Sequence, residues 1–173
     1  DDSTTVLIRC RRGVVLNILT GPPVDSRNDR ALVERFMAME GLKVVSGGTT
    51  ASVVERVTGA EIRLTPQSMG TLAPPAHRMD GVDLVTEGAV TMNHAHNILD
   101  APPERYEPNS AATELVTLMR NADRINFIVG CAANQASNDI RFTQQHILPR
   151  TTVVPLLKER LEKDGRLVVV EDV

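Results

Sequence analysis

Short runs of valine, isoleucine and leucine alternate along this chain with longer stretches in which apolar residues recur every three or four positions. The clearest runs lie at 14–19, 42–45, 82–86, 125–129 and 167–170. Such runs are typical of strands buried on both faces, and the stretches between them are typical of amphipathic helices. The alternation predicts a three-layer α/β fold with a mostly parallel, open sheet and helices on both faces. The strand order stays open.

Helix start and stop signals stand between these runs. Asp25 or Ser26 can cap a helix that Gly41 ends, and helices are also expected after Gly48, after Gly88 and after Asn109 or Ser110. Thr151 or Thr152 begins the last helix, in which Pro155 is tolerated if it falls in the first turn. The side chains expected to be nearly fully buried are Phe36, Val44, Val45, Leu84, Val85, Phe127, Ile128, Val168 and Val169.

Three further segments are less regular. The β-branched run at 4–10 predicts a strand that can pair with the edge of the sheet, and the alternating residues at 60–64 predict a minor or edge strand. The segment at 65–81 holds three prolines and two glycines and has no period. It is expected to be a long loop, either a functional lid or an excursion from the regular alternation.

Composition excludes several classes of protein. A chain of 173 residues with 42% apolar and 24% charged residues is typical of one globular domain. A net charge of −3 and four aromatic residues argue against a nucleic-acid partner, and no apolar run is long enough to span a membrane. Cys10 and Cys131 stand alone beside apolar runs, so they are expected to be reduced structural thiols, which favours the cytoplasm.

A glycine turn with two threonines follows the run at 42–45. Gly47 and Gly48 let the backbone approach a ligand without an intervening Cβ atom, and Thr49 or Thr50 can cap the helix that starts here. The first N–H groups of a helix lack intrahelical partners and attract phosphate or carboxylate groups. The turn therefore predicts an anion-binding site. The alternative is a tight connection between strand and helix with a threonine cap.

Polar loops follow three other strands as well. In an open parallel sheet of the Rossmann-like class, the loops after the carboxyl ends of the strands meet in one crevice, where ligands bind. The candidate ligand-binding residues in the four loops are Gly21, Asp25, Gly47, Gly48, Thr49, Thr50, Glu87, Gly88 and Asn134. Asp25, and Asp29 nearby, could converge with these residues if the strands are parallel; the alternative is that each carboxylate caps or faces a helix N-terminus. For Glu87, which could hold a ligand or a metal, the alternative is a structural hydrogen bond.

The histidines form no recognisable metal site. His94 and His96 lie two positions apart on a predicted helix, so their side chains point about 200° apart. His77 and His146 stand alone in loops, and no pair of cysteines supplies further ligands. No serine lies in a G-x-S-x-G turn, so the sequence gives no support to nucleophilic catalysis.

The first residues, Asp1-Asp2-Ser3-Thr4 and the apolar run after them, resemble the closing strand of SpoIIE-like, PPM-type serine/threonine phosphatases. The segments 19–23, 47–51 and 83–88 resemble the C-terminal extension that follows the phosphatase domain in a subset of these bacterial proteins. The resemblance implies that 1–12 is the last strand of a truncated phosphatase domain and that 13–173 is a single α/β domain. It also implies that Asp1 is a manganese or magnesium ligand in the parent phosphatase, with no cofactor expected in this fragment.

The resemblance and the predicted anion-binding site together indicate a function. We expect a regulatory or ligand-sensing α/β domain of a metal-dependent phosphoprotein phosphatase, which binds an anionic or phosphorylated ligand at the strand ends. Its implied partners are the upstream phosphatase domain and a small anionic ligand. One alternative is a small enzyme domain that acts on a nucleotide or phosphorylated metabolite, and another is a scaffold that forms a homodimer. The fragment alone is not expected to hydrolyse phosphoesters, because it carries only the last motif of the two-metal centre.

Overall fold

A computed structural model describes residues 2–8, 10–64, 76–132 and 146–173 of the chain. In these residues a seven-stranded sheet has the strand order β3-β4-β5-β2-β1-β6-β7. The strands are β1 (Val15–Thr20), β2 (Leu42–Ser46), β3 (Arg63–Leu64), β4 (His77–Met79), β5 (Val82–Thr86), β6 (Arg124–Val129) and β7 (Leu167–Asp172). The last five in spatial order pair in parallel, whereas β3 and β4 are antiparallel at one edge.

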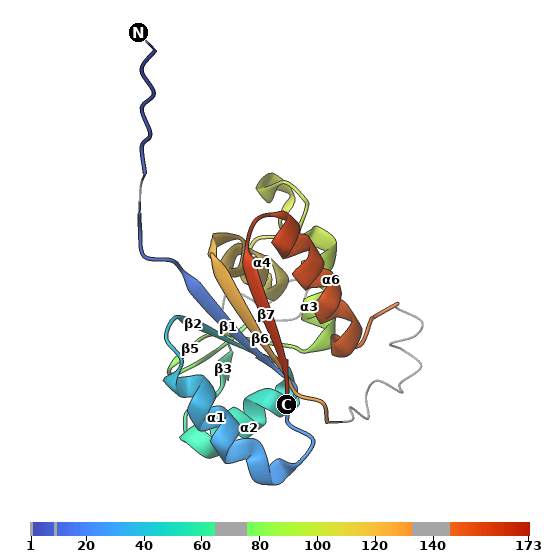
Figure 1. Cartoon of the computed structure of the whole chain (residues 1–173). Helices are drawn as coiled ribbons and strands as arrows, with labels where there is room; N and C mark the ends of the chain where they lie inside the picture. Colours follow the sequence, from blue (N-terminus) through green and yellow to red (C-terminus); the bar gives the residue numbers. More distant parts are fainter. Residues whose placement is uncertain (1, 9, 65–75, 133–145) are drawn as a thin grey trace.

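Helices cover both faces of the sheet, so the predicted three-layer α/β fold is confirmed (Figure 1). One face carries α1 (Asp29–Ala38) and α2 (Gly48–Thr58). The other face carries α3 (Ala89–Ile98), α4 (Ala111–Asn121) and α6 (Arg150–Lys163). Short 3-10 turns, η1 (Ser26–Asn28) and η3 (Pro103–Arg105), lie before α1 and between α3 and α4. No helix in the described part of the chain is long and apolar enough to cross a lipid bilayer.

Each face of the sheet has its own apolar core. Phe36 lies in the core under α1 and α2, and Phe127 lies in the core under α3, α4 and α6; both are fully buried. Of the nine side chains predicted to be buried, eight are, but Val169 is 39% exposed. The reason is the position of β7, which is the edge strand of the sheet. Val168 points into the larger core, so its neighbour Val169 faces the opposite side, where the described residues leave it partly exposed.

A polar pair links two neighbouring interior strands, β1 and β6. Asn17 of β1 and Asn126 of β6 are register partners, and Asn126 Nδ2 donates to Asn17 Oδ1 at 2.7 Å. Asn17 Nδ2 in turn donates to the carbonyl oxygen of Glu40 at 2.9 Å, and both asparagines are buried. Buried amides are stable in a sheet when their hydrogen bonds are satisfied, as they are here.

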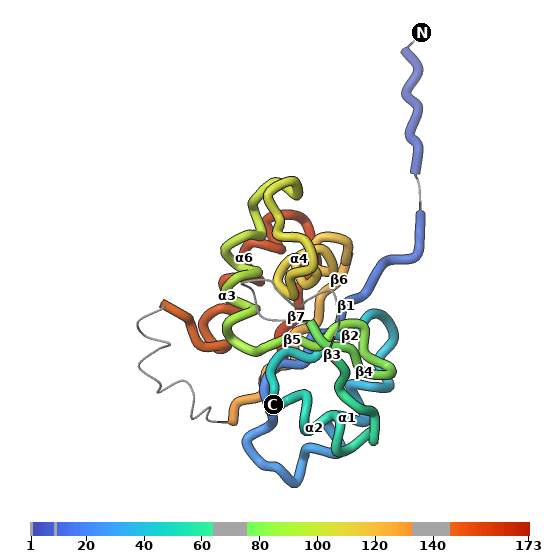
Figure 2. The backbone as a smooth tube through the Cα atoms, turned by 180° about the vertical axis from the view of Figure 1, so that it is seen from behind, coloured from blue at the N-terminus to red at the C-terminus, as the bar shows by residue number. Residues whose placement is uncertain are grey.

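The N-terminal segment corrects one prediction. Residues 2–8 form no strand, although a strand was predicted at 4–10, and Val6, Leu7 and Ile8 are exposed. The segment extends away from the sheet in both views (Figures 1 and 2). A β-branched run becomes a strand only where another strand satisfies its backbone groups, and the edges of this sheet are β3 and β7. The chain joins the domain near Arg11, whose guanidinium pairs with Asp123 at 2.5 Å.

Two other predictions differ from the structure in detail. The predicted loop at 65–81 contains β4, because His77–Met79 pairs with β5; residues 65–75 lie outside the described part. The edge strand predicted at 60–64 is confirmed as β3. Helix α6 begins at Arg150, so Pro155 lies in its second turn and not in the first. A proline there cannot donate to the carbonyl of Thr151, at a typical cost of about 3 kcal/mol, which burial of Val153, Val154, Leu157 and Leu161 offsets.

Candidate functional site

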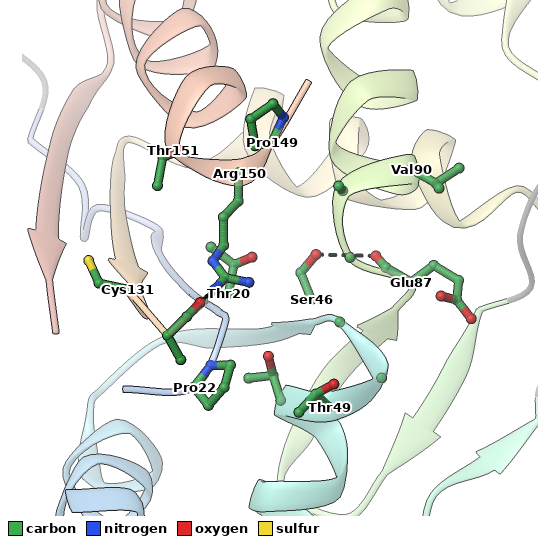
Figure 3. A pocket seen from close by; sticks show the side chains of 16 residues that line it. Thr20, Pro22, Ser46, Thr49, Glu87, Val90, Cys131, Pro149, Arg150 and Thr151 are labelled. Carbon is green, nitrogen blue, oxygen red and sulfur yellow. Dashed lines mark hydrogen bonds between the residues drawn. The ribbon is translucent and has the colours of Figure 1, made fainter. Parts of the chain in front are cut away.

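A pocket of about 500 Å³ opens at the carboxyl ends of four parallel strands, β5, β2, β1 and β6 (Figure 3). Its wall is built from the residues that follow each strand and from the first turns of α2, α3 and α6. Sites of this kind in open α/β sheets lie where neighbouring connections leave opposite faces of the sheet. Here α1 and α2 leave on one face and α3 and α6 on the other, so the pocket lies at that point.

Glycines bring the four strand ends close together. A Cβ atom on Gly130 would lie 2.1 Å from the carbonyl oxygen of Pro22, so only glycine fits between the ends of β1 and β6. A Cβ atom on Gly88 would lie 3.3 Å from the Cα atom of Gly47, a tight contact but not a clash, so the ends of β5 and β2 also lie close together. Gly47 also has a φ of 121°, a value that L-residues rarely adopt.

Hydroxyl groups hold these loops to one another. Thr50 Oγ1 accepts a hydrogen bond from the backbone N–H of Gly21 at 2.9 Å, which joins α2 to the end of β1. Ser46 Oγ and Thr86 Oγ1 donate to the backbone carbonyl of Glu87 at 3.2 and 2.8 Å. The pocket wall is therefore tied together by hydrogen bonds that run between the strand ends.

The N-termini of three helices line the pocket. The lining residues at these positions are Gly48, Thr49 and Thr50 of α2, Ala89 and Val90 of α3, and Arg150 and Thr151 of α6. Their N-cap residues are Gly47, Gly88 and Pro149, none of which has a side-chain oxygen that could accept from the helix. The first N–H groups of these helices are therefore free of side-chain caps, and each helix adds partial positive charge to the pocket.

Arg150 places a full positive charge in the same wall. Its Nε donates to the carbonyl oxygen of Gly130 at 2.7 Å, and its Nη2 donates to that of Ala132. Within the described residues it has no carboxylate partner, and Nη1 makes no hydrogen bond. The guanidinium lies against Gly21, where a Cβ atom would come within 2.5 Å of Arg150 Cζ. Burial lowers the pKa of Arg150, which means that a negative charge nearby would stabilise the guanidinium.

Thr20 adds a buried hydroxyl beside this charge. The residue is 2% exposed and lines the pocket, and its side chain makes no hydrogen bond with any residue that the structure describes. Figure 3 shows it in the same part of the pocket as Arg150. A ligand atom that reaches this wall of the pocket can form a hydrogen bond with the Thr20 hydroxyl, which can both donate and accept.

The pocket brings together most of the predicted ligand-binding residues. Gly47, Gly48, Thr49, Thr50, Glu87 and Gly88 all line it, and Gly21 lies between the lining residues Thr20 and Pro22. Asp1 and Asn134 lie outside the described residues. For Glu87, the backbone carbonyl takes the structural hydrogen bonds, and the carboxylate makes no bond with a described residue.

The two aspartates after β1 lie elsewhere and correct the prediction that they converge with the other loops. Asp25 is absent from the pocket wall; its side chain accepts from the backbone N–H of Arg27 at 3.0 Å and caps η1. Hydrogen bonds from the Arg27 side chain and backbone lower the pKa of Asp25. Asp29 forms an ion pair with Arg56 and joins α1 to α2. Both carboxylates therefore serve local structure, as the alternative interpretation has it.

Sequence reasoning missed Arg150, Thr20 and Cys131. A basic residue in the first turn of a helix opposes the helix dipole, and this was a signal that Arg150 has another role. Cys131 was expected to be a structural thiol, yet both cysteines are exposed, and Cys131 lines the pocket. The structural role of Cys131 was inferred from the apolar run before it, but that run ends at Val129 and Cys131 is exposed.

Comparison with known proteins adds no relative. No family model, curated protein or solved structure matches this chain. The resemblance to SpoIIE-like phosphatases therefore stays a prediction, and the argument about function rests on the pocket.

A second hollow of about 390 Å³ lies between α3 and residues 146–148 and is lined by His94, His96 and His146. In the described part of the chain, no three His, Cys, Asp or Glu side chains are grouped so that they could hold a metal ion.

Proposed function

We propose that this α/β domain binds a small anionic ligand in the pocket at the strand ends and acts as a ligand-sensing domain. The observation that carries the proposal is the meeting of three helix N-termini with a guanidinium that has no carboxylate partner among the described residues. Each helix N-terminus is equivalent to roughly half a positive charge, and Arg150 adds a full one. Among the lining residues the opposing charge is that of Glu87, which is exposed.

The geometry favours a ligand such as phosphate over a cation or an apolar molecule. Glycine turns let a ligand approach the backbone N–H groups of Gly48 and Thr49 directly, as in known phosphate sites at helix N-termini. The hydroxyl groups of Thr20, Thr49 and Thr151 also line the pocket and can donate to phosphate oxygens. A volume of about 500 Å³ lies within the usual range for small-molecule sites.

The regulatory part of the proposal is that ligand binding is coupled to a phosphatase domain joined at the N-terminal segment. Exposed Val6, Leu7 and Ile8 support it, because an apolar run without cover in this domain is suited to pairing with another one. Manganese or magnesium would belong to that partner domain, together with Asp1. A cytoplasmic location is part of the same proposal.

Phosphate titration of the full chain, followed by amide chemical shifts in heteronuclear NMR, tests the binding proposal. We expect millimolar phosphate to shift the amides of residues 48–50, 89–90 and 150–151. Arg150→Met removes the guanidinium and should weaken phosphate binding by about 10-fold or more, because hydrogen bonds to charged groups contribute about 1.5–3 kcal/mol. Gly48→Val fills the approach to the turn and should also weaken binding while the fold stays intact.

Arg120→Met is the matched control. Arg120 also donates to a main-chain carbonyl, that of Ala101, but it lies on α4 outside the pocket. The control changes the net charge by the same amount and should leave phosphate affinity nearly unchanged. The binding proposal is wrong if these amides do not shift, or if the two arginine variants weaken phosphate binding equally.

A further inference from the structure

We propose that the ligand is a phosphorylated polyol, with its phosphate at Arg150 and its hydroxyl groups at Glu87. This inference rests on the proposed anion-binding function and goes further by naming the chemical class of the ligand. Its basis is that the two charged side chains in the described pocket wall stand at opposite ends and carry opposite charges. Thr20, a residue that is 2% exposed, lines the wall beside Arg150, and its side chain makes no hydrogen bond with a described residue.

The two ends are too far apart for one small anion. Glu87 leaves the sheet after β5, whereas the Arg150 guanidinium lies against Gly21 after β1 and bonds to Gly130 after β6. In the strand order β5-β2-β1-β6, the ends are two to three strand spacings apart, roughly 10–14 Å. In the view of Figure 3, Ser46 lies between Arg150 and Glu87, and the Glu87 carboxylate points away from Arg150. A molecule that touches both ends must therefore be larger than inorganic phosphate.

The Arg150 end is suited to the phosphate. It combines Arg150 Nη1, which makes no hydrogen bond with a described residue, the N-terminus of α6 and the hydroxyl groups of Thr20 and Thr151. Guanidinium and phosphate form strong charge-assisted hydrogen bonds, and the partly buried position reduces competition from water.

The Glu87 end requires the opposite chemistry. A carboxylate only accepts hydrogen bonds, and the Glu87 carboxylate has no donor among the described residues. The hydrogen bonds that position this residue end on its backbone carbonyl, which leaves the side chain free for a ligand. A second phosphate would be repelled here, whereas hydroxyl groups of a polyol can donate to both carboxylate oxygens. Val90, on the first turn of α3, supplies an apolar surface for the carbon skeleton beside it.

Isothermal titration of the full chain with three probes tests this inference. The probes are inorganic phosphate, ribose 5-phosphate and pentyl phosphate, which has the same number of carbon atoms but no hydroxyl groups. We expect ribose 5-phosphate to bind about 10-fold more tightly than pentyl phosphate, because hydroxyl groups replace lost water at a charged acceptor. Glu87→Gln should reduce this preference to about 3-fold or less and leave the affinity for inorganic phosphate unchanged or higher.

Glu104→Gln is the matched control, since Glu104 is an exposed acid of η3 outside the pocket. It should keep the full preference for ribose 5-phosphate. Equal affinity for the two esters in the unaltered chain, or a preference that survives Glu87→Gln, overturns the inference about the polyol. If the polyol inference fails but inorganic phosphate still binds, the proposed anion-binding function is retained. If the chain binds none of the three probes, the anion-binding function and the polyol inference are both wrong.

Discussion

Substitution of Gly130 by alanine is the sharpest test of how the pocket is built. The new Cβ atom would lie 2.1 Å from the carbonyl oxygen of Pro22 and 2.2 Å from that of Gly21. Real Cβ atoms almost never come within 3.0 Å of another heavy atom, so the backbone at the end of β1 or β6 must move. Forced expansion of a packed site typically costs about 1–3 kcal/mol, and backbone contacts place this substitution in the upper part of that range.

Gly48→Ala is the paired control, because nothing lies within 4 Å of a Cβ atom at that position and its φ is not positive. Alanine at a compatible glycine position stabilises a protein by about 0.4–1 kcal/mol, chiefly through the entropy of the unfolded chain. The free energies of unfolding of the two variants should therefore differ by about 2.5–4 kcal/mol, with opposite signs relative to the unaltered chain. Urea denaturation with a common m-value measures this difference.

Gly130→Ala should also weaken phosphate binding, since the Gly130 carbonyl is the acceptor that positions Arg150 Nε. A Gly130→Ala chain that is as stable as the unaltered one would refute the close approach of β1 and β6. The argument that glycine is required where the strand ends meet at the pocket would then also be wrong, because Gly130 would be replaceable.

Three further predictions concern the core, the N-terminal segment and the pocket thiol. Phe36→Ala should lower the free energy of unfolding by about 3–5 kcal/mol because the ring is fully buried, and a cost near zero would mean that α1 does not pack as described. Hydrogen bonds from Arg11 and from the Val14 N–H lower the pKa of Asp123, so this contact is present above the ordinary aspartate value of 3.8 and is lost as pH falls through the lowered pKa. The Val14 amide should report that loss in a pH titration, and Asp123→Asn should abolish the transition. In a Cys10→Ser chain, millimolar phosphate should slow alkylation of Cys131, which is exposed and lines the pocket; an unchanged rate would argue that phosphate binds elsewhere.

The local features of the fold were readable from the sequence because they depend on neighbouring residues. The run at 82–86 coincides with β5, because burial on both faces requires a continuous apolar run. Gly48, which follows the run at 42–45, begins α2, because the turn between strand and helix depends on local backbone geometry. Val169 was misjudged because an apolar run does not reveal whether its strand lies at the centre or the edge of the sheet. Strand order depends on contacts between distant segments, and the pattern of one segment does not contain it.

The same limit explains what was found of the candidate site. The glycine turn at 47–48 was recognised because its residues are adjacent in the chain. Arg150 was missed because its role depends on Gly21 and Gly130, which are far away in sequence. The predicted strand at 4–10 was wrong for a related reason: its composition is suited to a strand, but none of the strands that the structure describes pairs with residues 2–8.

The buried contact between Asn17 and Asn126 has a consequence for folding accuracy. Runs of valine, isoleucine and leucine can slide past one another by two positions and still bury apolar side chains on the same faces. Such a slip of β6 along β1 would separate the two amides by about two residues and leave them unsatisfied inside the protein, which is costly. The pair thus favours one alignment of β1 and β6. That alignment also brings Gly130 level with Gly21, so the same buried amides that disfavour misaligned strands also disfavour a misassembled pocket.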